Sequence, residues 1–417
     1  MLDRNEKLKV LHINTNESGG GASDFSRKFV SNNEKYCLLA VGNKEDKNSS
    51  ALNIKRFNIE KAIEFIDKIL WKLSIKKGFR ISFSFHDKLH FTFYNLRRSK
   101  AYHEADIIHL HNIHGSYFNF NDLCEILKEK HVVWSMHDMW AFSGGETFFL
   151  ESTDYKTGEA TNHSNQYYPL YGPLIDRRKS YYREKKKLYA QFFNKITFVP
   201  GSNWLDNCFK ESFVYNSKIK SIVIREGCNS NVFYNHNNRT WIKPRVLIVN
   251  TSIFYKGTEV FKDLFQKFTN EFTLYVIGND LDLSFGELEV IQLKKTKNEV
   301  DFAELLNSVD YLIFPSIQDN SPLVVTMALL CGVKIIGSNS SGVKEQMSLC
   351  GGLPFEPKSK LELEKILLSL NLKKDRKCSS KQSKIAARIY SETEMYNQYL
   401  NLYSKITGKD VKLHPQN

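Results

Sequence analysis

The chain has 417 residues, 41% of them hydrophobic, which is enough apolar material for two domains of about 200 residues each. No apolar run approaches the roughly 18 residues that span a bilayer, and the charged start of the chain is not typical of a signal peptide. The seven cysteines are scattered without a CxxC pair, so we expect reduced thiols in a cytosolic protein rather than disulfides or zinc.

The net charge of +13 is concentrated in two segments. Residues 68–100 carry nine Lys and Arg against one acid, interleaved with aromatic residues, and residues 177–187 carry seven against one. A basic and aromatic segment indicates an anionic membrane surface or an anionic lipid-linked substrate as partner. The alternative is a solvated helix face with no partner. Nucleic acid is not expected, because no DNA- or RNA-binding motif accompanies the charge.

Strand patterns alternate with helical patterns along the whole chain. In the first half, strands are predicted at 9–15, 105–111, 131–137, 195–202 and 218–224. In the second half, they are predicted at 245–250, 272–278, 310–316 and 333–339. Helices are predicted after the first glycine turn to about residue 32, at 120–129, from 203, from 257, near 299–308, at 322–331 and from 342. Apolar strands alternating with helices predict two α/β units with doubly wound parallel sheets.

The polar segment 225–244 is the predicted linker between the two units, and a last helical pattern follows at about 379–407. We place the domains at 1–228 and 240–385, with a helix at 386–408 that packs back on the first domain. Ligands of doubly wound sheets bind at the carboxyl ends of the strands, so we expect a central cleft between the two domains.

Five segments contain residues suited to chemistry. Gly19, Gly20 and Gly21 follow a strand and open a helix, where a backbone can approach a phosphate closely; a plain flexible turn is the alternative. His109, His111 and His114 have a spacing like that of metal ligands, but no acidic cluster completes them, so we expect polar groups lining a cleft and no metal.

The other three segments follow later strands. His137 and Asp138 end a strand beside the aromatic Trp140, and such charge-capable groups are costly there unless used or paired. Lys256 opens a helix and could meet a diphosphate, with a solvated lysine as the alternative. Asp319 lies in a polar corner, where Ser321 reads as the N-cap of an apolar helix.

In chain order, these stretches resemble the family-four retaining glycosyltransferases of the GT-B fold, close to the colanic-acid and capsule biosynthesis members. The resemblance rests on the following stretches, which span nearly the whole chain: "LHINTNESGGGAS", "IIHLHNIHG", "VVWSMHDMWAFSGG", "FVPGSNWL", "YKG", "LLNSVDYLIFPSIQDNSP", "ALLCG", "SSGVKEQM" and "EMYNQYLNLYSKI".

The resemblance implies a role for each matched residue. His137 and Asp319 would be catalytic, His137 at the reaction centre and Asp319 on the transferred sugar. The donor would be bound by the C-terminal domain and the glycine loop, through Gly19, Gly20, Gly21, Lys256, Gly278, Asn320, Ser321, Met327 and Gly342. The acceptor would be bound by the N-terminal domain, through His111, Asn112, His114 and Trp140. The reaction would retain anomeric configuration and need neither a metal nor a cofactor beyond the nucleotide-diphosphate sugar.

Two positions depart from the family pattern. Met327 stands where the second acid of a Glu-x7-Glu motif would grip the ribose, and Thr251 stands where an arginine would meet the diphosphate. Methionine cannot replace a carboxylate as a hydrogen-bond acceptor. These departures motivate a rival interpretation, a degenerate GT-B protein that binds a glycan or a partner without turnover.

We therefore predict a cytoplasmic transferase, peripheral on the inner face of the plasma membrane. It would move a hexose-like sugar onto a surface-polysaccharide precursor, a lipid-linked glycan of a capsule, O-antigen or exopolysaccharide. A nucleotide-sugar epimerase shares the fold but not the "HDMW" and "HLHNIHG" stretches. A DxD metal site at Asp280 and Asp282 would fall in a predicted loop.

Overall fold

The computed structural model describes residues 7–54, 92–114, 118–150, 152–161, 177–250, 256–279 and 287–415. The chain divides into two compact units, the first comprising residues 1–201, 205–224 and 396–414, and the second comprising residues 202–204, 225–395 and 415–417. Most of the first basic segment, Thr251 and the Asp280–Asp282 pair lie outside the described residues.

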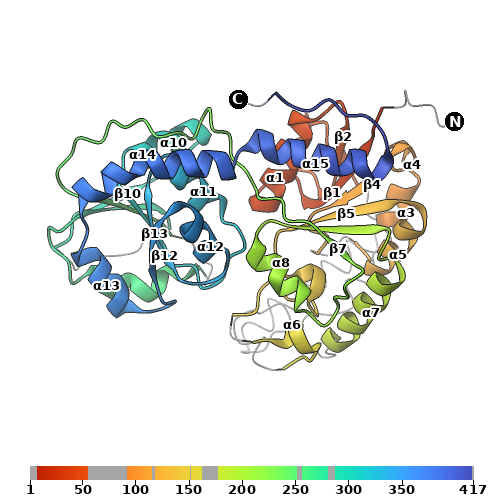
Figure 1. Ribbon diagram of the computed structural model, residues 1–417, viewed down its shortest axis with the longest axis horizontal. Coiled ribbons are helices and arrows are strands. Elements are labelled where there is room, and N and C mark those ends of the chain that lie inside the picture. The colour runs from red at the N-terminus through yellow and green to blue at the C-terminus, as the bar shows by residue number, and fades with distance from the viewer. Residues whose placement is uncertain are drawn as a thin grey trace. The chain divides into compact units, whose positions relative to one another are not determined.

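The described strands of the first unit form one parallel sheet in the order β3-β2-β1-β4-β5-β6-β7 (Figure 1). Its strands are β1 (Val10–Asn16), β2 (Cys37–Asn43), β3 (Leu52–Asn53), β4 (Ile107–Leu110), β5 (His131–Met136), β6 (Ile196–Pro200) and β7 (Lys220–Ser221). Its α-helices are α1 (Gly21–Asn32), α3 (Thr92–Arg97), α4 (Lys100–Glu104), α5 (Phe120–Glu129), α6 (Asp154–Thr157), α7 (Arg178–Gln191) and α8 (Asn203–Lys210). The strand order reverses between β1 and β4, which makes this point the expected ligand site of a doubly wound sheet.

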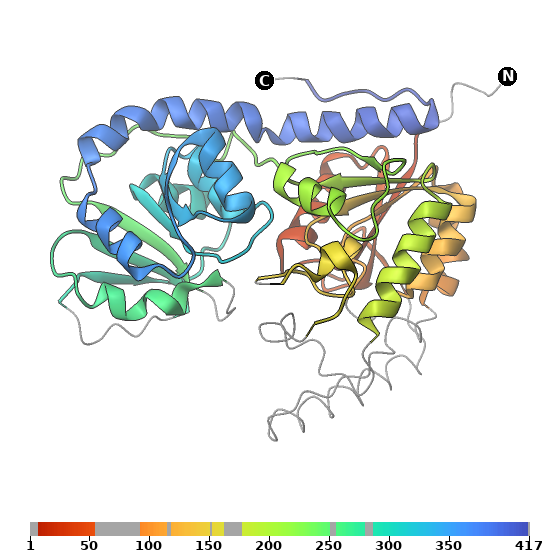
Figure 2. The same cartoon turned by 60° about the horizontal axis from the view of Figure 1, so that its bottom comes forward.

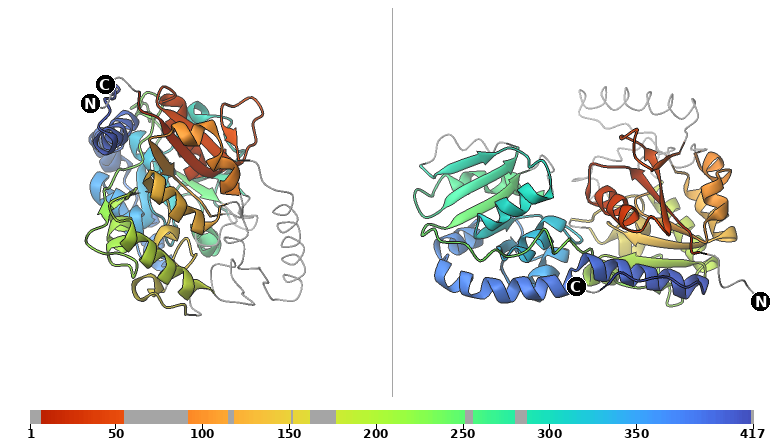
Figure 3. Two further views of the ribbon diagram at one scale, coloured as in Figure 1. Left: turned by 90° about the vertical axis from the view of Figure 1, so that its right-hand side faces the viewer. Right: turned by 90° about the horizontal axis from the view of Figure 1, so that it is seen from above.

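One face of this sheet is covered by α1 and by the C-terminal helix α15 (Glu392–Thr407), which runs along the first unit in the right-hand view of Figure 3. The ring of Phe29 on α1 lies 5.2 Å from those of Tyr396 and Tyr399 on α15. Nearly all residues of β1, β4, β5 and β6 are buried, as expected for strands covered on both faces.

Strand register brings several histidines to the face under α1 and α15. His12 of β1 pairs with His109 of β4, and His109 pairs with Val133 of β5. Since side chains alternate along an extended chain, the residues two positions further on, His111 just after β4 and Ser135 in β5, share that face. This explains why His12, His111 and Ser135 share one layer.

The described strands of the second unit form a parallel sheet in the order β10-β9-β8-β11-β12-β13, whose switch point lies between β8 and β11. Its strands are β8 (Arg245–Asn250), β9 (Thr273–Gly278), β10 (Val290–Leu293), β11 (Tyr311–Phe314), β12 (Lys334–Ser338) and β13 (Gly352–Phe355). Its α-helices are α9 (Lys262–Phe265), α10 (Glu299–Asn307), α11 (Leu323–Leu330), α12 (Ser341–Cys350), α13 (Lys360–Leu368) and α14 (Leu372–Ile389).

Two apolar clusters make up the core of the second unit. One joins α11, α12 and α14 and contains Val325, Leu329 and Val343; the other joins α9 and α13 and contains Phe265 and Leu363. Figure 2 shows α14 running beside α11 and α12. Among the described helices, none is both long and apolar enough to cross a membrane.

Two element predictions need correction. The single helix expected at 379–407 is two helices, α14 and α15, with Tyr390 in a non-helical conformation at the end of α14. The N-cap of α11 is Pro322 rather than Ser321, because Pro322 has an extended backbone (φ −65°, ψ 118°) and α11 begins at Leu323. Ser321 therefore precedes the cap, and its predicted capping role is wrong.

Candidate functional site

The loops that leave β1 and β4 are tied together at the switch point of the first unit. The Thr15 hydroxyl contacts the carbonyl oxygens of Asn112 at 2.9 Å and His114 at 2.6 Å. The backbone N–H of Asn112 donates to the side-chain oxygen of Asn14 at 3.2 Å. These contacts hold Asn112 and His114, which are predicted to bind the sugar acceptor, beside β1, the strand that precedes the glycine loop.

The glycine loop is exposed where it enters α1. Gly19 has a φ of +90°, a conformation that side-chain-bearing residues rarely adopt. An added Cβ at Gly20 or Gly21 would meet no heavy atom within 4 Å, and Gly20 has an extended φ of 169°. Packing therefore does not require glycine at these two positions, which leaves room for a ligand to approach the backbone.

Five predicted residues of the first unit come together. His111, Asn112, His114, His137 and Trp140 line one cavity, to which Asp138 also contributes. Its volume is about 10 Å³, no more than the space that one water molecule needs.

Asp138 organises the exposed side of this group. Its carboxylate lies 3.0 Å from Nε2 of His114 and accepts the backbone N–H of Trp140 at 2.8 Å. The sequence pattern showed no acidic partner for His114. The structure shows that Asp138, 24 residues further along the chain, is that partner. Spacing alone could not identify it.

Lys185 of α7 holds Trp140 in place. The Lys185 ammonium lies 4.0 Å from the centre of the Trp140 ring, donates to the Trp140 carbonyl and donates to the Ser143 carbonyl at 2.9 Å. Arg178 lies 3.3 Å from Glu146, and both are buried. Two of the seven bases of segment 177–187 therefore stabilise the interior and cannot face a membrane.

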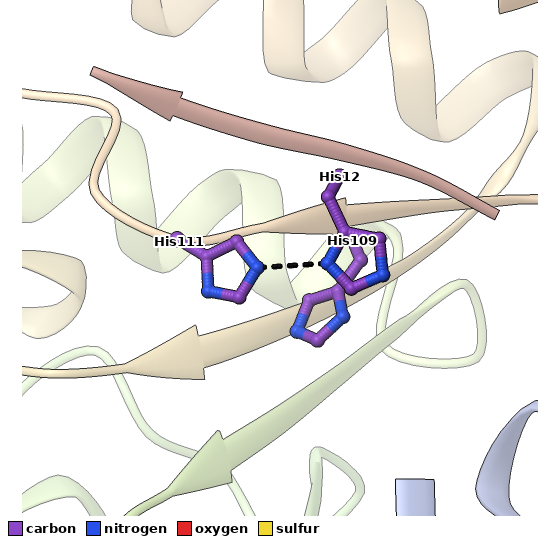
Figure 4. Close-up of side chains that lie close together, drawn as sticks. All are labelled: His12, His109 and His111. Atoms are coloured by element: carbon purple, nitrogen blue, oxygen red, sulfur yellow. Dashed lines mark hydrogen bonds between the residues drawn. The ribbon is translucent and has the colours of Figure 1, made fainter. Parts of the chain in front are cut away.

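His12, His109 and His111 form a buried cluster (Figure 4). One nitrogen from each ring lies within 4.8 Å of the others, close enough for a metal to be considered. However, Nδ1 of His12 is already 2.9 Å from Nε2 of His111, and His109 bonds Tyr403 at 2.5 Å and Ser135 at 2.8 Å. The ring nitrogens are mostly committed to hydrogen bonds, so the cluster is explained without an ion.

Burial keeps these histidines neutral. It lowers the pKa of His12 to about 3 and holds the pKa values of His109 and His111 well below their ordinary range. His111 also lies 3.1 Å from Nε2 of His137, which is only partly buried. The cluster thus extends to the predicted catalytic histidine.

In the second unit, two predicted residues meet at the switch point between β8 and β11. The Lys256 ammonium lies 2.5 Å from the Asp319 carboxylate, with side-chain exposures of 25% and 12%. Lys256 precedes Gly257 in the loop after β8, and Asp319 lies in the loop after β11. A cation and an acid are therefore adjacent where a doubly wound sheet binds its ligand.

The Asp319 loop is held by the start of α12. The backbone N–H of Gly342 donates to the Asp319 carbonyl at 2.9 Å, and the Ser341 hydroxyl accepts the Asp319 N–H at 3.0 Å. A Cβ on Gly342 would lie 1.4 Å from the Asn320 carbonyl oxygen. The backbone of the loop therefore packs directly on Gly342, which explains the glycine at this position.

The remaining donor predictions occupy different environments. The buried Asn320 accepts the Ser202 hydroxyl at 2.6 Å, whereas Ser321 is partly exposed. Gly278 has a φ of +104° and a Cβ there would lie 2.2 Å from the Asn250 carbonyl oxygen, so the packing of β9 on β8 already explains it. Met327 is partly buried against the core cluster of α11, α12 and α14.

A second cavity in the first unit was not predicted. It has a volume of about 550 Å³ and lies between α1, the end of β2 and the loop at 45–51, with Arg27 and Glu45 in its lining. It borders the glycine loop at Ser18 but includes none of the predicted site residues. The sequence signal for it was a cluster of serines and acids after β2, which has no specific pattern.

Residues 236–386 match the family model of the glycosyl transferases group 1, so the second unit contains a group 1 glycosyltransferase domain. The chain is 24% identical over 330 residues to the putative colanic acid biosynthesis glycosyl transferase WcaC of Escherichia coli K12, an alignment that covers 72% of this chain and 76% of WcaC.

Solved structures with similar folds include the sucrose-phosphate synthase of Thermosynechococcus elongatus (TM-score 0.66, 13% identity, covering 96% of this chain and 100% of that one). Anabaena HepE with UDP-glucose is similar with a TM-score of 0.62, 13% identity and coverage of 95% and 100%. WaaG, a glycosyltransferase involved in lipopolysaccharide biosynthesis, is similar with a TM-score of 0.58, 13% identity and coverage of 96% and 100%. The predicted GT-B fold, two Rossmann-like domains, is confirmed.

Proposed function

Because residues 236–386 form a group 1 glycosyltransferase domain, we propose that the chain transfers a sugar from a nucleotide-diphosphate donor to a surface-polysaccharide precursor. Three relatives support this proposal. WcaC is named for colanic acid biosynthesis, WaaG for lipopolysaccharide biosynthesis, and HepE has been solved with UDP-glucose.

The pairing of Lys256 with Asp319 at the switch point is the observation that carries the proposal. A lysine there offers a point charge to the donor diphosphate. A carboxylate beside it accepts hydrogen bonds from sugar hydroxyls. One pair of side chains thus provides both halves of a nucleotide-sugar site, one for the leaving group and one for the transferred group.

In the proposed reaction, negative charge develops on the departing diphosphate, and Lys256 and the start of α12 at Gly342 stabilise it. The diphosphate itself assists the incoming hydroxyl on the same face of the sugar, so the configuration is retained without a protein nucleophile or a metal. His137 orients the reacting groups, and Asn112, His114 and Trp140 bind the acceptor. His111, which was also predicted to bind the acceptor, is buried with both ring nitrogens hydrogen-bonded to other histidines, so it supports His137 instead.

A panel of UDP-, GDP- and TDP-sugars tests the proposal by thermal shift and by slow hydrolysis of the donor. The expected result is a shift with the sugars of one nucleotide, reduced by Lys256→Ala but not by Lys243→Ala. Lys243 is a matched control because it pairs with Glu289 just before β8 and β10 begin, at the edge of the sheet opposite the site. The absence of a response to every nucleotide sugar would end the enzyme proposal.

The second candidate is a GT-B protein that binds a glycan or partner without turnover, and Met327 favours it. Met327 packs partly against the core, so Met327→Glu would bring a carboxylate to an apolar margin. For a working pocket we expect weaker donor binding and reduced stability. A large gain in donor affinity would instead identify a decayed ribose site and support the second candidate.

We further propose that the acceptor is lipid-linked and that α7 contacts an anionic membrane surface. Four bases of α7 are exposed: Lys179, Arg183, Lys186 and Lys187. Arg183→Glu with Lys187→Glu should abolish cosedimentation with vesicles containing anionic lipid, without changing the fold. Equal sedimentation of the wild type with neutral vesicles, or of the variant with anionic ones, would contradict the membrane proposal.

A further inference from the structure

Three imidazoles of the first unit form a continuous chain of hydrogen bonds. Nδ1 of His12 lies 2.9 Å from Nε2 of His111, and Nδ1 of His111 lies 3.1 Å from Nε2 of His137 (Figure 4 shows the first bond). The chain begins under α1 and α15, where His12 and His111 are at most 1% exposed, and it ends at the partly buried His137.

The protons of this chain must all point in one direction. A neutral imidazole has one N–H and one lone pair, and both nitrogens of His111 are engaged with another histidine. His111 therefore donates to one neighbour and accepts from the other. Either every ring carries its proton on Nδ1, or every ring carries it on Nε2.

The far end of the chain distinguishes these two arrangements. Nε2 of His12 is fully buried and makes no hydrogen bond. With protons on Nε2, a buried N–H would be left without an acceptor, and folded proteins leave buried N–H donors of the backbone unpaired less often than acceptors. With protons on Nδ1, only a lone pair is left unsatisfied, and both bonds of the chain are retained.

We propose that His12 and His111 are positioning residues that fix the proton of His137 on Nδ1. The Nε2 lone pair of His137 is then committed to His111. His137 cannot serve as a general base at Nε2 without breaking that bond. The assignment of a substrate to His137 rests on the proposed glycosyl transfer; the tautomer itself does not.

Two-bond proton–nitrogen NMR correlations on protein labelled with ¹⁵N-histidine test this directly, with each signal assigned by a His→Asn substitution. In the wild type, His12, His111 and His137 should all carry the proton on Nδ1. His12→Asn, which retains an amide donor near the Nδ1 position, should leave His137 unchanged. His12→Leu removes the donor and should give His137 a mixture of tautomers.

The matched control is His131→Asn, since His131 lies on β5 but bonds Thr197 instead of the chain. It should leave the signal of His137 unaltered. With a nucleotide sugar that the protein turns over, His12→Leu should lower kcat about tenfold, which is the equivalent of one hydrogen bond. His12→Asn should have a kcat near that of the wild type.

Several results would overturn the inference: a proton on Nε2 of His137 in the wild type, an unchanged His137 in folded His12→Leu, or one equivalent of divalent metal bound among the histidines. If His12→Leu fails to fold, the position of the His137 proton measured in the wild type still tests the inference. Failure to bind any nucleotide sugar would remove the proposed function but leave the tautomer result standing, so the two failures are distinguishable.

Discussion

Lys256 and Asp319 bond each other at 2.5 Å, so a donor bound as we propose would insert its diphosphate and sugar between groups that already satisfy one another. The energetic consequence is a competition: phosphate oxygens replace the carboxylate on Lys256, while sugar hydroxyls replace the ammonium on Asp319. A hydrogen bond to a charged group contributes about 1.5–3 kcal/mol. Loss of either partner should therefore change donor affinity by roughly 10- to 100-fold.

At the same scale, the buried histidines make stability depend on pH. Burial lowers the pKa values of His12, His109 and His111 below the ordinary 6.5, so the unfolded chain binds more protons as the pH falls below that value. Stability is then lost from about pH 7 downward, and for His12 the loss continues toward pH 3.

We predict that unfolding free energy falls by several kcal/mol between pH 7.5 and 5.5, with the three histidines contributing about equally. Urea titrations at the two pH values measure it. His12→Asn should reduce the loss by about one third. An identical pH dependence in wild type and variant would mean that His12 is already protonated in the native state.

At the scale of elements, the start of α12 and the loop after β11 depend on one another. We predict that Gly342→Ala displaces the Asp319 loop, because its Cβ would lie 1.4 Å from the Asn320 carbonyl. Overpacking of this kind costs about 1–3 kcal/mol, measurable as a lower thermal midpoint, and donor binding should fall with it. Gly20→Ala, where a Cβ meets nothing within 4 Å, is the control whose midpoint should not change.

The C-terminal helix α15 is tied to the first unit by polar contacts as well as aromatic ones. The Tyr403 hydroxyl lies 2.5 Å from Nδ1 of the fully buried His109. Tyr403→Phe leaves that nitrogen unsatisfied, and we predict a loss of about 1–3 kcal/mol in urea unfolding. Tyr396→Phe, whose hydroxyl meets the more exposed Asn32, should cost less. Equal losses of unfolding free energy in the two variants would show that the bond to His109 stabilises the fold no more than the bond to Asn32.

Most strands that are apolar throughout could be predicted from the sequence, whereas the edge strands β3 and β10 could not. The predicted strand 245–250 coincides with β8, and the strand at 131–137 exceeds β5 by one residue. Residues 37–43, which form the mostly buried β2, carry the same apolar signal and were omitted. The strands β3 and β10 are short and largely exposed, so they have no apolar run to identify them.

For the molecule as a whole, both sheets have their switch point where the chemistry-bearing residues gather, after β1 and β4 in one unit and after β8 and β11 in the other. His111, His137, Lys256 and Asp319 could be singled out as candidates from the sequence because each follows a strand. The sequence could not predict the His12 end of the histidine chain, since only strand register and the packing of α15 bring it there.

The most direct test of the account is calorimetric titration of the wild type, Lys256→Ala and Asp319→Asn with one nucleotide sugar and with its bare nucleotide diphosphate. Lys256→Ala should weaken both ligands by roughly 10- to 100-fold. Asp319→Asn should weaken the nucleotide sugar but not the bare diphosphate, which makes no use of the carboxylate and loses a competitor for Lys256. Wild-type affinity for both ligands in both variants, or no binding by the wild type, would contradict the claim that this pair forms the donor site.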